Sequence, residues 1–213
     1  MKKLIETLKN IWSIEELRKR IVYTLLLIFV YRVGCYITLP GIDPKMLKLE
    51  GSQDGLLGIL NMFAGGAFSR ASIFALGVMP YISASIFMQL AGIVVPQVAK
   101  LQKEESGRKK INQYTRYLTV LVTAFQASAY VAYLRNQTNG AVIPEMSAFL
   151  FWLSTVVVLT SGTLFVMWLG EKITDKGIGN GVSLLIMVGI LARFPHSLIQ
   201  EFTAKNLGGG GGL

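Results

Sequence analysis

Residues 76–86 read LGVMPYISASI, and the interpretation of the whole chain depends on this stretch. It is apolar enough for a membrane, yet it carries Gly77 and Pro80 in its first turns and two serines further on, with Gln89 beyond them. A helix that only anchors a protein in lipid needs none of these residues, whereas a helix that lines something polar can use them. The stretch is therefore either a lipid-facing span or part of a pathway.

The composition indicates a membrane protein. Of the 213 residues, 52% are hydrophobic and 15% are charged, whereas soluble domains carry about a quarter charged residues, and the apolar residues here form long runs. The one cysteine, Cys35, excludes a disulfide within the chain and a CxxC metal site. The one histidine, His196, lies beside Pro195 and no Gly-x-Ser-x-Gly motif occurs, which disfavours a Ser/His hydrolase.

Five apolar runs predict five membrane spans, at about residues 21–39, 73–95, 117–134, 148–169 and 182–193. The first is longer than the hydrophobic part of a signal peptide and no small-x-small cleavage site follows it, so we expect it to be retained. The fifth is short for a bilayer, which needs about 20 residues, and hydropathy alone also fits a re-entrant segment there.

Two further segments are apolar but too short to cross. Residues 1–17 carry apolar and charged positions at helical spacing, which predicts an amphipathic helix on the membrane surface. Residues 55–68 read GLLGILNMFAGGAF and are broken by Asn61 and by the pair Gly65-Gly66. Shortened, glycine-broken apolar segments point to the working site of a transporter-like fold.

The distribution of basic residues predicts the orientation. If the N-terminus is cytoplasmic, fourteen Lys and Arg side chains fall inside and six fall outside, which agrees with the excess of positive charge in cytoplasmic segments. The pattern predicts an N-in, C-out layout with five crossings. The inner set is Lys2, Lys3, Lys9, Arg18, Lys19, Arg20, Lys100, Lys103, Arg108, Lys109, Lys110, Arg116, Lys172 and Lys176.

Two motifs have simple structural interpretations. Residues 177–181 read GIGNG, but no strand precedes them and no Lys-Ser/Thr pair follows, so a tight turn between two spans fits better than a nucleotide loop. All twelve acidic residues fall in terminal or loop segments. An ion-coupled transporter would place carboxylates at the bilayer midplane, and their absence from the predicted spans disfavours that class.

Two pairs of branched residues share a helix face. Val78 and Ile82 are four residues apart, and Ile186 and Ile190 repeat this spacing on the fifth segment. Such pairs can face lipid, or they can contribute to a hydrophobic constriction that resists water and ions. The spacing alone leaves both interpretations open.

Three long motifs resemble the SecY family, the central channel subunit of the bacterial Sec translocon. Residues 63–86 (FAGGAFSRASIFALGVMPYISASI) and 162–185 (GTLFVMWLGEKITDKGIGNGVSLL) are similar to its two signatures. Residues 105–117 (ESGRKKINQYTRY) resemble the cytoplasmic tip between its second and third spans, and Pro40-Gly41-Ile42 fits the turn after its first span. The resemblance covers about residues 10–200, in order.

The resemblance implies an all-α, polytopic membrane protein with five transmembrane helices, a plug half-helix and an N-terminal amphipathic helix. Family members have ten spans in two pseudo-symmetric halves, and this chain resembles only the first half. Residues 1–20 would form the cytoplasmic lead-in, 21–194 the five-span half with the plug at about 55–68, and 195–207 the start of an external hinge. Residues 208–213 have the composition of a flexible linker.

The resemblance also implies roles for individual residues. Val78, Ile82 and Ile186 would belong to the pore ring, although Val78 is smaller than the isoleucine often found at that position. Plug residues would be Leu56, Leu57, Ile59, Leu60, Asn61 and Phe63. Ser83, Ser85, Gln89 and Gln126 would lie on the lateral-gate side, and Arg108, Lys109, Lys110 and Arg116 in a cytoplasmic loop.

The expected function is half of a protein-conducting channel, which would move unfolded secretory proteins across the bacterial inner membrane and release apolar segments into lipid. It is not an enzyme, needs no cofactor and should be inactive alone. Expected partners are the C-terminal half, SecE, SecG, SecA or the ribosome, the preprotein, the lipid bilayer and a second copy of the isolated half. The alternatives are half of an inverted-repeat small-solute transporter and a membrane scaffold without a pore.

Overall fold

The computed structural model describes residues 12–43, 55–137 and 147–207 and is helical in these ranges, apart from connecting segments and isolated bridge residues such as the pair Thr38 and Ser72. Most of the predicted surface helix and the linker at 208–213 lie outside the described residues. The helices are α2 (Glu15–Gly34), α3 (Gly55–Phe63), α4 (Met79–Val94), α5 (Pro96–Lys103), α6 (Glu105–Gln137), α7 (Ala148–Lys176) and α8 (Gly181–Leu207).

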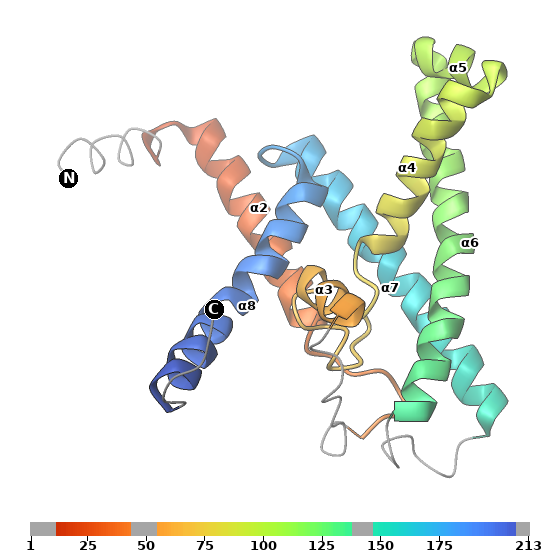
Figure 1. Ribbon diagram of the computed structural model, residues 1–213. Helices are drawn as coiled ribbons and strands as arrows, with labels where there is room; N and C mark the ends of the chain where they lie inside the picture. Colours follow the sequence, from red (N-terminus) through yellow and green to blue (C-terminus); the bar gives the residue numbers. More distant parts are fainter. Residues whose placement is uncertain (1–11, 44–54, 138–146, 208–213) are drawn as a thin grey trace.

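The helices form two groups joined by α7 (Figure 1). On one side α2 and α8 pack against α7 and against each other, and α3 packs on α8. On the other side α4 and α5 pack on α6, which packs along α7. The start of α2, the short helix α5 and the turn between α7 and α8 all lie at one end, which we call the charged end, so successive long helices alternate in direction.

By length and composition, two helices can cross a membrane, Gly107–Asn136 within α6 and Ala148–Lys176. The pair α4 and α5 qualifies as one broken span, bent by 107°, and Gly181–Ala192 is apolar but shorter. Because α2 carries Arg32 near its end and basic residues near its start, its sequence is less apolar. The all-helical membrane fold is confirmed, whereas the number of five crossings stays a prediction.

Several predicted boundaries are displaced. The second span begins at Met79 rather than at residue 73, and the predicted cytoplasmic loop at 105–117 is the first part of α6. The last helix continues through Pro195 to Leu207, across the expected start of an external hinge. Proline removes one backbone donor and bends a helix, but a long helix can continue beyond it when neighbouring groups satisfy the freed carbonyl.

The sharp bend after α4 has a local cause. Pro96 is the first residue of α5 and has no backbone N–H, so the helical ladder ends at Val95, which is extended. The amide of Gln102 then donates to the carbonyl of Met88 at 3.2 Å. The amide end of Gln102 lies directly over Gly92, where a Cβ would displace it.

The core is built around the irregular segment 64–78. Phe74 of this segment stacks between Tyr31 of α2 and Phe165 of α7, with ring centroids 6.0 and 5.9 Å away. A Cβ on Gly34 would collide with the Phe74 ring, and one on Gly162 would collide with the carbonyl oxygen of Ile73. The two glycines therefore let α2 and α7 close on the segment from both sides.

We predict that Gly162→Ala destabilises the protein by about 1–3 kcal/mol, the usual cost of inserting a methyl group into a packed core. The measurement is the free energy of unfolding in mixed detergent micelles. Ser161→Ala is the matched control, because the Ser161 side chain is exposed on the same helix. Equal stability of the two variants would show that α7 does not rest on the segment as described.

Candidate functional site

A polar hollow of about 550 Å³ opens at the charged end, and we call it the inner cleft. Its walls come from α4, α5, α6, the last turns of α7 and the turn before α8. Ser85, Gln89, Gln102, Asn112, Arg116 and Glu171 are among its polar lining residues. Among the described residues no group of three or more His, Cys, Asp and Glu side chains could hold a metal ion. The cleft therefore offers mixed hydrogen-bond donors and acceptors.

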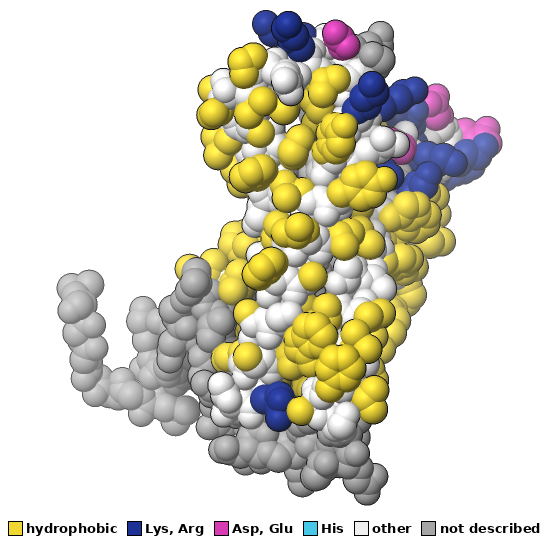
Figure 2. All heavy atoms as spheres, turned by 90° about the vertical axis from the view of Figure 1, so that its right-hand side faces the viewer, with side chains coloured by type: hydrophobic (Ala, Val, Ile, Leu, Met, Phe, Trp, Pro, Cys, Tyr) yellow, Lys and Arg dark blue, Asp and Glu magenta, His cyan; other side chains and the backbone are white. Residues whose placement is uncertain are grey.

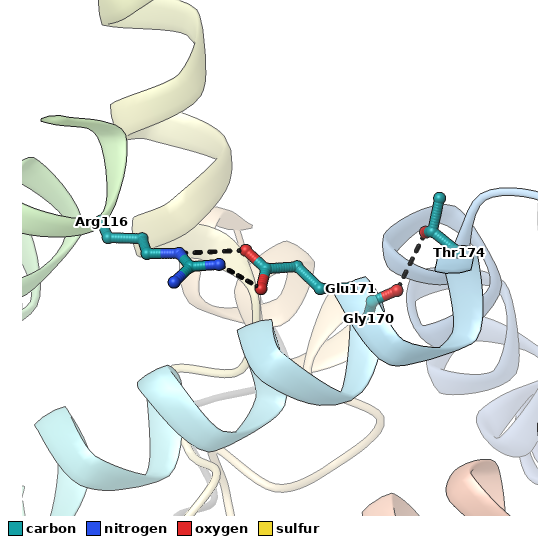
Figure 3. Close-up of polar contacts among 4 residues, drawn as sticks. All are labelled: Arg116, Gly170, Glu171 and Thr174. Atoms are coloured by element: carbon teal, nitrogen blue, oxygen red, sulfur yellow. Dashed lines mark hydrogen bonds and ion pairs between the residues drawn. The ribbon is translucent and has the colours of Figure 1, made fainter. Parts of the chain in front are cut away.

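Arg116 and Glu171 form an ion pair across this cleft (Figure 3). The Arg116 Nη2 atom lies 2.6 Å from Glu171 Oε2, and Nε donates to Oε1 at 3.3 Å, so two nitrogens face two oxygens. Half of the Arg116 side chain and 30% of the Glu171 side chain remain exposed. The pair joins α6 to α7 and is accessible to water.

The turn between α7 and α8 is held by side-chain hydroxyls. Thr174 accepts from the Gly181 amide at 2.9 Å and donates to the Gly170 carbonyl at 2.9 Å. Thr24 of α2 accepts from the Ile178 amide at 3.1 Å. Gly179 has a φ of 68°, which confirms the predicted tight turn. These bonds place the start of α8 relative to both α7 and α2.

Of the three pore-ring candidates, Val78 directly precedes α4, Ile82 lies on α4 and Ile186 lies on α8. Val78 is 6% exposed in the core, and Ile82 lies one turn later, half-buried against the same core. Ile186 lies on α8 in a shallow apolar hollow of about 370 Å³ that Ile190 also lines. Val78 and Ile82 pack in the same core, whereas Ile186 lines a separate hollow on α8, so their joint role in a ring stays a prediction.

The plug candidates belong to α3, which rests on α8. Asn61 is fully buried, and its Oδ1 accepts from the Ser69 amide at 3.1 Å. The α3 end lies against Gly189 of α8, where a Cβ would come within 2.8 Å of the Phe63 carbonyl oxygen. Arg32 of α2 donates to the Gly65 carbonyl at 3.4 Å. The segment from α3 to Gly65 therefore contacts two helices, α2 and α8.

The exposure of the plug candidates differs. Ile59 is exposed, whereas Leu60 and Phe63 are half-buried. The side chains of Leu56 and Leu57 lie outside what the structure describes. Their collective role as a plug stays a prediction.

The four lateral-gate candidates do not gather in one place. Ser85 and Gln89 line the inner cleft, where the Gln89 amide donates to the Ser85 hydroxyl at 3.4 Å. Ser83 is exposed and donates to the Met79 carbonyl of its own helix. Gln126 lines a separate, mainly apolar hollow of about 260 Å³ between α3, α4 and α6.

Basic side chains gather at the charged end, above a broad band of hydrophobic side chains (Figure 2). Arg108, Lys109 and Lys110 are exposed on the first turns of α6, so they lie on a helix rather than in a loop. Large apolar side chains are exposed on α4 and α6, where Ile93 is 82% exposed and Phe125 is 76% exposed. This division into a charged end and an apolar belt is typical of a protein that spans a membrane.

Sequence reasoning missed the partners that organise the cleft. Glu171, Thr174 and Thr24 were not singled out, because Arg116 and Glu171 are 55 residues apart and Thr24 is 154 residues from Ile178. Residues this far apart in the chain share no periodic pattern, so the sequence does not reveal that they are partners. The one available signal was an acidic residue, Glu171, directly after an apolar run in the second SecY-like block.

Comparison with known proteins gives a consistent result. The family model SecY matches residues 72–211. The chain is 43% identical to the protein translocase subunit SecY of Aquifex aeolicus, over 95% of this chain and 49% of that protein. It is 46% identical to the subunit of the same name from Escherichia coli K12, over 91% of this chain and 44% of that protein. The chain thus spans about half the length of these relatives.

Two solved structures share the fold. A protein-conducting channel superimposes with a TM-score of 0.56 at 19% identity, over 86% of this chain and 41% of that one. Sec61 in the canine ribosome-channel complex superimposes with a TM-score of 0.57 at 19% identity, over 86% of this chain and 42% of that one. At this identity the likeness concerns the fold alone.

We predict that Gly189→Val loosens α3 from α8, because the added side chain would meet the Phe63 carbonyl. Hydrogen–deuterium exchange in residues 58–66 should rise about five- to tenfold, the equivalent of an overpacking cost near 1 kcal/mol. Met187→Val is the control, since Met187 is exposed on the same helix. Unchanged exchange in the Gly189 variant would mean that α3 does not depend on this contact.

Proposed function

The chain belongs to the SecY family, and we propose that it forms the N-terminal half of a protein-conducting channel. The observation that carries the proposal is its 43–46% identity, over more than nine-tenths of its length, to protein translocase subunits of which it spans about half. The complete channel would move unfolded secretory proteins across the membrane and admit apolar segments sideways into lipid. The similarity to channels favours this function over a solute-transporter half or a scaffold without a pore.

In the proposed mechanism the chain supplies walls and seals, and no covalent bond is made or broken by it. Val78 directly before α4, Ile82 on α4 and Ile186 on α8 would provide part of an apolar ring, because branched side chains exclude water from a narrow opening. The α3 segment would close the opening from the outer side. A signal sequence that wedges between α4 and the missing half would open the gate past Ser83, Ser85, Gln89 and Gln126.

The proposed setting is the bacterial inner membrane, with the N-terminus in the cytoplasm. The charged end would then face the cytoplasm, in agreement with the excess of positive charge expected there. The C-terminal half would complete the ring and gate, SecE and SecG would complete the complex, and SecA or the ribosome would deliver the preprotein near Arg108, Lys109 and Lys110. In isolation, the uncovered apolar faces favour a dimer of two such halves.

The proposal predicts that this chain alone does not translocate a preprotein, whereas the chain together with the C-terminal half, SecE and SecG does. The measurement is SecA- and ATP-dependent protection of a preprotein from added protease in reconstituted vesicles. Vesicles with the C-terminal half alone are the control. Import into vesicles that hold only this chain would contradict the half-channel interpretation.

A second prediction concerns the ring. In the assembled channel, replacing both Val78 and Ile82 by glycine should raise the resting ion conductance, because the lost side chains leave a gap that water can fill. Planar-bilayer recording measures this directly. The same replacement of Ile86 and Ile93, which are exposed on α4, serves as the control. Equal conductance of both double variants and the unmodified channel would contradict the ring.

A further inference from the structure

We infer that the Arg116–Glu171 ion pair is a tether between the two helix groups and sets the resting width of the inner cleft. The inference rests on the proposed function for its consequence, which is the threshold at which a signal sequence opens the channel. Its structural part, that the ion pair sets the width of the cleft, is independent of that function, because the width can be measured in this chain alone.

The first observation is that each side of the cleft is a braced unit. On one side, the Gln102–Met88 hydrogen bond and the close approach at Gly92 hold α5 against α4, and both helices pack on α6. On the other side, Thr174 ties the start of α8 to α7, and Thr24 ties the same turn to α2. Each side can therefore move as a body more easily than it can deform.

The second observation is that these units separate toward the charged end. The helices α6 and α7 lie close together at the opposite end and diverge toward α5 and the α7–α8 turn (Figure 1). The space between them there is the inner cleft of about 550 Å³. Arg116 extends from α6 and Glu171 from α7, and their side chains meet across the space (Figure 3).

The third observation is the geometry of the pair. Two other ion pairs between described residues, Lys19–Glu15 and Arg20–Glu16, lie within α2 and join neighbouring turns of one helix. Arg116–Glu171 instead links two helices through two nitrogens and two oxygens, an arrangement that restrains both distance and orientation. A pair that remains partly exposed is also weak enough to be broken by an entering chain.

Its place on α7 connects the pair to the start of α8. Glu171 lies three residues before Thr174, so both side chains occupy neighbouring positions on the helix, and Thr174 holds the Gly181 amide at the start of α8. On the opposite wall, Tyr81 and Ser85 line the cleft from α4. Separation of Arg116 from Glu171 would thus let α4 with α6 move away from α7 with α8, the helices that carry Ile82 and Ile186.

The structural part is tested in this chain, reconstituted in lipid nanodiscs. Spin labels are placed at two exposed positions of the charged end, Gln113 on α6 and Lys176 on α7, with Cys35→Ala removing the native thiol. Glu171→Gln should lengthen and broaden the label-to-label distance distribution. The charge swap of Arg116→Glu with Glu171→Arg should restore it, and Glu15→Gln, which breaks an ion pair within α2, should leave it unchanged.

The functional part is tested in the assembled channel with a preprotein that carries a defective signal sequence. Glu171→Gln should raise its translocation relative to a normal preprotein by about two- to fivefold, the range expected for loss of a half-exposed ion pair. The charge swap should return the ratio to that of the unmodified channel.

The outcomes separate the two proposals. A distance distribution that Glu171→Gln leaves unchanged, or one that the charge swap fails to restore, overturns the tether. An altered distance with an unaltered translocation ratio overturns its role in the threshold. If the unmodified assembled channel translocates nothing, the proposed function fails, while the distance measurement still decides whether the pair holds the cleft.

Discussion

The non-helical backbone of residues 64–78 lies buried between helices of a membrane protein, and its polar groups must therefore be satisfied within the chain. Lipid offers no hydrogen bonds, so such a segment is stable only when protein surrounds it. The Leu39 amide donates to the Ala71 carbonyl at 2.8 Å, the Ile73 amide to the Ile37 carbonyl at 2.9 Å, and the Tyr130 hydroxyl to the Phe68 carbonyl at 2.6 Å. These bonds tie the segment to the chain after α2 and to α6.

Much of the surrounding structure follows from this constraint. Because Phe74 occupies the space between α2 and α7, both helices carry glycine at the point of closest approach. Because the segment ends at Val78, α4 starts at Met79 with Pro80 in its first turn, where a missing N–H costs nothing. The contact between α3 and α8 lies at the other end of the segment 64–78. A displacement of α3 would therefore act on the core through residues 64–66.

Polar side chains on the long helices and polar side chains in the inner cleft find their hydrogen-bond partners in different ways. Hydroxyls on the long helices mostly bond to their own helix: Thr119 and Thr123 each donate to the carbonyl four residues earlier and are buried. Such groups need no solvent. The cleft instead keeps Arg116, Glu171, Gln89 and Gln102 at an accessible surface.

The sequence by itself determined the membrane class from its composition and long apolar runs, and the turn at residues 177–181 from its glycines. The resemblance of three long motifs to the SecY family implied the family and the all-helical fold. The sequence extended the second span to residue 73, with Gly77 and Pro80 inside it, since apolar residues that pack inside the protein look the same as residues that face lipid. Residues 105–117 were interpreted as a loop from their resemblance to the cytoplasmic tip of the family, whereas they form the first part of α6. Only the tertiary structure decided that Arg116 meets Glu171, that Thr24 holds the α7–α8 turn and that Gln126 lies apart from Gln89. Those contacts depend on how helices far apart in the chain cross, and no local pattern of residues encodes a crossing.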